Sequence, residues 1–169
     1  TGYGYACSAI ELQPTDYNGK VVLLVDASLV STIPAAITQV QSDLRADGWI
    51  TLRHDIVSGT SVTTVRNLVI ADYNADASNV KAVYIIGHVP VPYSGNLAPD
   101  GHTDQHMGAW PCDTYYGEMN GTWTDNTVNN TTGWDPNKNI PGDGKFDQSS
   151  PPNTVELQVG RVDLYDMPY

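Results

Sequence analysis

Two histidines and an aspartate alternate in a polar part of this 169-residue sequence. They are His102, Asp104 and His106, and alternate positions of an extended chain can aim side chains to one side. Imidazole nitrogens and a carboxylate are ligands that suit zinc or another transition metal. Asp100 and Asp113 could add oxygen ligands. The spacing predicts a transition-metal site, and the alternative is a hydrogen-bonded or solvated loop with no ion.

Oxygen-bearing side chains farther along form a second pattern of possible metal ligands. They are Asp135, Asn137, Asn139, Asp143 and Asp147, with Asp-Gly turns near the end. The pattern resembles an EF-hand-like calcium loop, although its glycine is displaced, a proline intrudes and the last aspartate comes one place late. The residues therefore predict calcium binding. The alternative is a cluster of turns in which the same side chains bond to nearby backbone amides.

A histidine and a cysteine raise a third chemistry, that of a cysteine nucleophile. His88 follows an apolar run, and Cys112 lies downstream in a Trp-Pro-Cys-Asp segment. A thiol becomes a reactive thiolate only with help from a nearby base such as histidine. A His88–Cys112 dyad competes with a histidine that bonds to loop backbone. Cys112 could instead pair with Cys7 in a disulfide in an oxidising compartment, or both thiols could stay free.

The overall charge limits the partners of this chain. It holds 19 acidic and 8 basic residues, a formal net charge of −11. Such a field repels phosphate backbones, so nucleic acid is excluded as a partner, whereas cations are favoured. No run of 18 apolar residues occurs, so no membrane insertion is predicted. The few lysines and the many tyrosines, asparagines, threonines and glycines are typical of a secreted, extracellular protein.

The elements that must position these residues alternate between strand and helix. A continuous apolar run at 21–25 predicts a strand covered on both faces, ending at Asp26, which could be catalytic or cap a helix. Ser31 or Thr32 is expected to cap the next helix, and Gly48 to end it. A strand follows at 49–57. Ser61 is expected to cap a second helix, and the run 82–86 predicts a third strand.

This order predicts an α/β fold with a mostly parallel sheet and flanking helices, because short strand-helix-strand connections form right-handed parallel crossovers. Residues 1–19 are expected to be an irregular amino-terminal segment. Residues 20–169 then form one module: a β-α-β-α-β core at 20–92, a long loop region at 93–153 and a strand at 154–163. Ligand and catalytic groups of such sheets gather at the carboxyl ends of the strands.

Three short motifs follow one another after the second helix. They are a strand with the sequence Val-Tyr-Ile-Ile-Gly ending at Gly87 with prolines at 90 and 92, the segment Asp113-Thr-Tyr-Tyr-Gly117 with Asn120-Gly121 behind it, and the strand Val159-Gly-Arg161-Val162. This succession resembles the gingipain-type cysteine peptidases, which are secreted bacterial hydrolases with a caspase-like fold. The resemblance covers about residues 80–163, and the preceding β-α-β-α unit is compatible with it. The β-α-β-α-β start is expected to be caspase-like or flavodoxin-like.

The resemblance places the catalytic residues outside this sequence. In that family a His-Gly pair and a later cysteine follow the Val-Gly-Arg strand. The chain is therefore expected to be a fragment, the non-catalytic amino-terminal part of such a peptidase domain, with the rest of its own polypeptide as partner. A protein or peptide substrate and self-assembly are further partners to consider. Two alternatives stay open: a non-catalytic extracellular structural or binding module, and a metal-dependent hydrolase centred on the His102, Asp104 and His106 triplet.

Overall fold

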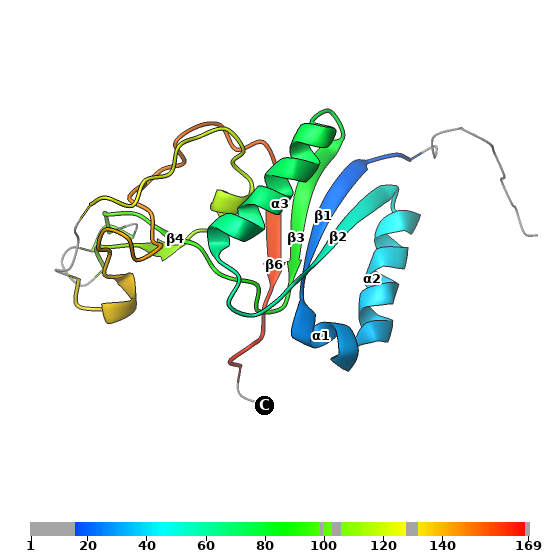
Figure 1. Cartoon of the computed structure of the whole chain (residues 1–169), viewed down its shortest axis with the longest axis horizontal. Coiled ribbons are helices and arrows are strands. Elements are labelled where there is room, and N and C mark those ends of the chain that lie inside the picture. Colours follow the sequence, from blue (N-terminus) through cyan, green and yellow to red (C-terminus); the bar gives the residue numbers. More distant parts are fainter. Residues whose placement is uncertain (1–15, 99, 103–105, 128–131, 168–169) are drawn as a thin grey trace, which may run out of the picture.

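A four-stranded, wholly parallel sheet forms the centre of the molecule (Figure 1). The computed structural model describes residues 16–98, 100–102, 106–127 and 132–167. The sheet order is β2-β1-β3-β6. The strand bounds are β1 Gly19–Asp26, β2 Trp49–Ile56, β3 Val80–Ile86 and β6 Gln158–Val162. The predicted α/β class with a mostly parallel sheet is confirmed.

Helices cover both faces of this sheet, which explains the continuous apolar run of β1. Leu23 and Val25 pack with Ile37 of α2 (Pro34–Ala46) on one face. Val22 and Leu24 belong to the larger core on the other face, which also contains the buried side of α3 (Val62–Ala75). Successive side chains of a strand point to opposite faces, so a strand between two helical layers must be apolar throughout.

Local capping fixes where the helices begin and end. The Asp26 side chain accepts a hydrogen bond from the Ser28 amide and caps the short helix α1 (Ala27–Thr32), and Ser61 caps α3 in the same way. Gly48 follows α2 with a φ of 86°, a left-handed conformation that glycine adopts without strain.

One capping prediction is wrong. Ser31 and Thr32 do not cap α2, because both already lie in α1, and α2 begins at Pro34 after Ile33 with no side-chain cap. The physical reason is that Asp26 starts a helix directly at the end of β1, several residues earlier than expected.

The long region between β3 and β6 is mostly irregular, as predicted, but it contains short ordered pieces. An antiparallel pair joins β4 (Tyr93–Ser94) to β5 (Trp110–Pro111). Two 3₁₀ turns, η1 (Asp113–Tyr116) and η2 (Asp135–Asn137), follow. Figure 1 shows much of this region extending to one side of the sheet. It shares the larger core, since Tyr115, Tyr116 and Phe146 are buried with the α3 residues.

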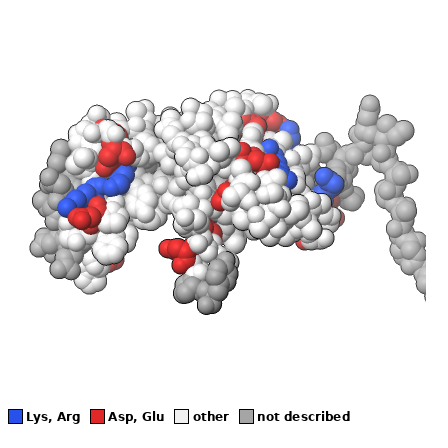
Figure 2. Space-filling model, turned by 60° about the horizontal axis from the view of Figure 1, so that its bottom comes forward, with Lys and Arg blue, Asp and Glu red and all other residues white. Residues whose placement is uncertain are grey.

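Ion pairing leaves little free positive charge on the protein. Six of the eight Lys and Arg residues form ion pairs with carboxylates: Lys20, Arg53, Arg66, Lys138, Lys145 and Arg161. Figure 2 shows a face that is largely uncharged, with basic side chains beside acidic ones. Among the helices that the structure describes, none is both long and apolar enough to cross a membrane.

Candidate functional site

Arg161 of β6 joins three segments that are far apart in the sequence. Its Nε and Nη2 atoms donate to the two carboxylate oxygens of Asp113, at 2.7 and 2.8 Å. Its guanidinium also donates to the carbonyls of Val89 at 2.6 Å and Pro90 at 3.3 Å. Only 12% of the Arg161 side chain is exposed. The two parallel bonds match the planar fork of a guanidinium, so lysine could not make the same contact.

Other residues of the Asp-Thr-Tyr-Tyr-Gly segment also attach it to distant parts of the chain. The Tyr116 hydroxyl donates to the Pro90 carbonyl at 2.7 Å, and burial raises the pKa of this phenol far above its ordinary value. The Gly117 carbonyl accepts from the amides of Glu156 and Leu157. A Cβ atom at Gly117 would lie 2.6 Å from the Leu157 carbonyl oxygen, so only glycine fits without displacement. These residue types therefore serve packing and hydrogen bonding.

A buried ion pair ties α3 to the turn after η1. Glu118 is fully buried, and one of its carboxylate oxygens accepts from Arg66 Nη2 at 3.0 Å. The same carboxylate accepts from the amides of Asn120 and Gly121 and from the indole of Trp123. A buried carboxylate needs such partners because burial disfavours the charged form. Sequence reasoning missed this pair; the only local signal was the Asn-Gly turn beside Glu118.

The carboxyl edge of the sheet carries a pocket of about 450 Å³, where the order of strands reverses between β1 and β3. His88 follows β3 and its Nδ1 lies 2.9 Å from Asp163 Oδ2 after β6. Asp26, at the end of β1, accepts from the His88 amide at 3.2 Å. Burial alone would raise the pKa of Asp26, but hydrogen bonds from Ser28 and His88 outweigh it and lower the pKa. Asp163 was not predicted.

No hydrogen bond joins His88 to Cys112 in the part of the chain that the structure describes, and a dyad of these two residues stays a prediction. His88 is hydrogen-bonded to Asp163, and its ring stacks on Tyr165 with 4.1 Å between ring centroids. Cys112 directly precedes η1, and burial raises the pKa of its thiol. A reactive cysteine needs the opposite shift, toward the thiolate. Cys7, the predicted disulfide partner of Cys112, lies outside the described residues.

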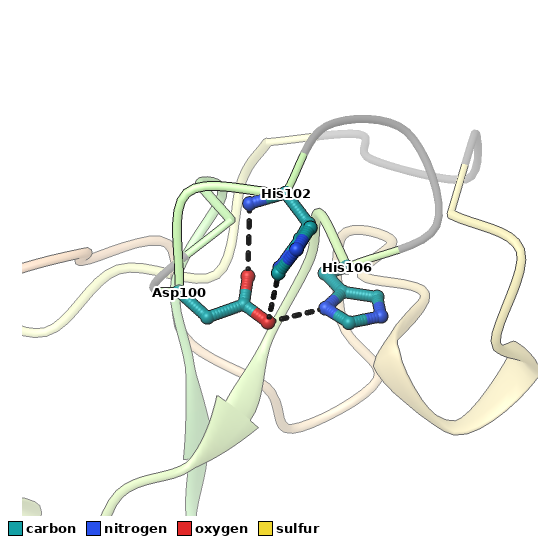
Figure 3. Close-up of side chains that lie close together, drawn as sticks. All are labelled: Asp100, His102 and His106. Carbon is teal, nitrogen blue, oxygen red and sulfur yellow. Dashed lines mark hydrogen bonds and ion pairs between the residues drawn. The ribbon is translucent and has the colours of Figure 1, made fainter.

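The structure brings together Asp100, His102 and His106 in the loop between β4 and β5 (Figure 3). Their ligand atoms all lie within 4.8 Å of one another. Asp100 Oδ2 lies 3.1 Å from His102 Nδ1 and also contacts His106 Nδ1. The hydrogen bond from His106 and those from His102 lower the pKa of the Asp100 carboxyl. The predicted third member, Asp104, lies outside the described residues, and the predicted additional ligand Asp113 pairs with Arg161.

A second pocket, of about 430 Å³, adjoins this cluster through His106. The other described residues that line it are Trp110, Gly133, Trp134 and Asn137. Trp134 is 63% exposed, whereas Asn137 is 3% exposed. The Nδ2 atom of Asn137 is buried with no hydrogen-bond partner among the described residues. Most buried polar groups are paired, so this amide is a donor that a bound ligand could satisfy.

The residues predicted to bind calcium are close in sequence, but in the structure each of their carboxylates has its own protein partners. Asp135 pairs with Lys138, Asp143 accepts from the amides of Ile140 and Lys145, and Asp147 accepts from Thr124 and from the amides at 126 and 127. Asn137 and Asn139 are buried. Within the described chain, the three carboxylates do not meet in one cluster. Calcium binding stays a prediction.

No known protein family, curated protein or solved structure matches this chain. What the fold itself defines is a class: an α/β protein with a parallel sheet covered by helices on both faces. Any function must therefore be argued from the contacts within the molecule.

Proposed function

We propose that this chain is the supporting, non-catalytic part of a secreted, gingipain-like cysteine peptidase domain. The observation that carries the proposal is the set of contacts made by Arg161. The three motifs on which the resemblance rests are one connected unit, since Arg161 of the third motif binds Asp113 of the second and the carbonyls that follow the first. The three motifs therefore depend on one another for their position in the fold, which supports reading them together as one pattern.

The exposed edge of the sheet supports the same proposal. β6 pairs with β3 on one side, and no other described strand pairs with its second side. Alternate residues of β6 are exposed, and Val162 and Leu164 are 47% and 64% exposed. An unpaired parallel edge with apolar side chains is suited to receive a further strand and its covering helix. The rest of the same polypeptide is the partner that we propose for it.

The test begins with the full-length gene product, which must continue beyond Tyr169 if the proposal holds. We expect a strand ending in His-Gly and a later strand ending in cysteine in that extension. The longer protein should hydrolyse a denatured protein substrate and lose this activity after thiol alkylation, whereas residues 1–169 alone should be inactive. An extension without this histidine and cysteine contradicts the proposal, and so does hydrolysis by residues 1–169 that depends on Cys112.

A second candidate function is a non-catalytic extracellular binding module. The pocket beside His106 favours it, because exposed Trp134 and the unpaired amide of Asn137 offer an aromatic surface and a hydrogen-bond donor. An extension without the peptidase residues would favour this candidate over the first. Light scattering then separates a module that self-assembles from one that stays monomeric and binds a different partner.

A further inference from the structure

The cluster of Asp100, His102 and His106 has the donor atoms of a metal site. Two imidazole nitrogens and one carboxylate oxygen meet in a single loop, all within 4.8 Å of one another. Figure 3 shows both rings directed at the same carboxylate. Ligands bound to one zinc ion at about 2.0–2.2 Å lie within this range of one another, so small side-chain rotations would admit an ion.

The backbone around the cluster holds these side chains near one another. The Asp100 side chain accepts a hydrogen bond from the His102 amide at 3.1 Å, which fixes the turn between them. The Trp110 indole donates to the His106 carbonyl at 2.8 Å and ties that residue to the start of β5. These two bonds involve all three residues but none of the proposed ligand atoms, because the His102 amide donates to Asp100 Oδ1 and the ligand atom is Oδ2. Such positioning lowers the ordering cost of binding an ion.

The surroundings favour an ion that keeps an open coordination position. His102 is 74% exposed, so solvent reaches the cluster. His106 also lines the adjoining pocket, where the buried Nδ2 atom of Asn137 has no hydrogen-bond partner among the residues that the structure describes. Sites with three protein ligands commonly bind water or another small ligand in the fourth position. A buried donor with no partner in the described chain, in a pocket that His106 also lines, is a second observation that points to a bound molecule here.

We propose that Asp100, His102 and His106 bind one divalent transition-metal ion of the zinc class. The atoms that lie closest together are Asp100 Oδ2 and the Nδ1 atoms of the two histidines, and these are the ligand atoms that we assign. Two imidazoles and one carboxylate select such an ion over calcium, which prefers six to eight oxygen ligands. This site is independent of the proposed peptidase function.

The test is a titration of protein without an affinity tag, after chelator treatment, with Zn²⁺ in a calorimeter. We expect one Zn²⁺ per chain, and Co²⁺ should give visible absorption bands of a site with nitrogen and oxygen ligands. Asp100→Asn, His102→Ala and His106→Ala should each weaken Zn²⁺ binding by at least about tenfold, the scale seen when even an outer partner of a metal ligand is removed. Because the cluster is exposed, these variants should stay folded, and unchanged melting temperatures in the absence of metal verify this.

Two matched controls sharpen the result. His54→Gln removes a histidine that is also paired with a carboxylate, Asp72 at 2.7 Å, but lies on β2, and Zn²⁺ binding should not change. Asp104→Asn tests the carboxylate expected from sequence spacing alone. Wild-type protein that binds no Zn²⁺ overturns the proposal, as does binding that survives in both Asp100→Asn and His102→Ala. Loss of binding in Asp104→Asn with full binding in Asp100→Asn also overturns the assignment.

Discussion

Replacing Arg161 by alanine should destabilise the fold strongly. The side chain donates four hydrogen bonds, two to the Asp113 carboxylate and one each to the carbonyls of Val89 and Pro90. Removing one member of a buried ion pair costs about 3–5 kcal/mol, since the other charge is left without its partner. Asp113 is 28% exposed and water can reach it, which favours the lower end. We therefore expect a loss of about 3 kcal/mol.

The assay is urea unfolding followed by tryptophan fluorescence. For a slope of about 2 kcal/mol per molar urea, the expected loss moves the midpoint down by about 1.5 M. Arg53→Ala is the control, because Arg53 pairs with the more exposed Asp55 and should cost less than about 1 kcal/mol. Arg161→Lys should recover only part of the loss, since lysine lacks the two-pronged geometry.

A double-mutant cycle separates the ion pair from general damage. When Asp113→Asn is combined with Arg161→Ala, the loss of stability in the double variant should be smaller than the sum of the two single losses by at least about 1 kcal/mol, as expected for residues in direct contact. The reasoning is refuted if Arg161→Ala stays within about 1 kcal/mol of wild type, the range of an exposed pair. Simple additivity of the two single losses would also refute it.

Three further predictions follow from contacts of the same framework. Gly117→Ala should lower the free energy of unfolding by about 2 kcal/mol, because the added Cβ meets the Leu157 carbonyl. Gly160→Ala is the control and should be nearly neutral, because a Cβ there has nothing within 4 Å. Equal unfolding midpoints for the two variants would contradict this. Glu118→Gln should lower the free energy of unfolding by about 3 kcal/mol in the same assay, since the Arg66 guanidinium keeps its bonds to backbone carbonyls but loses its counter-charge. A loss like that of an exposed pair would argue against a buried salt bridge. Asp26→Asn should lower the free energy of unfolding at neutral pH, because a carboxyl with a lowered folded-state pKa adds stability above its unfolded pKa. The difference in free energy of unfolding between the variant and wild type should shrink as the pH falls below 3.8. A difference that grows on acidification would reverse the sign of our argument.

The sheet could be predicted because its signals are local. The continuous apolar run before Asp26 has only one stable environment, a strand covered on both faces, and β1 is buried in that way. Ser61 and Gly48 mark helix ends through bonds and backbone angles within a few residues. The cap predicted at Ser31 or Thr32 failed where two local signals competed, since Asp26 begins a helix first.

The candidate sites needed the tertiary structure. The sequence identified His102 and His106 as possible ligands with Asp104 as the third, and named Asp100 only as an additional oxygen ligand. In the structure Asp100 is the carboxylate that meets both histidines. Arg161 and Asp113 are 48 residues apart, and Arg66 and Glu118 are 52 apart, so no spacing rule pairs them. Propensity and capping depend on neighbouring residues and are determined by the sequence directly. Which distant charges meet depends on how the irregular region folds back on the sheet, and only the packed structure decides that.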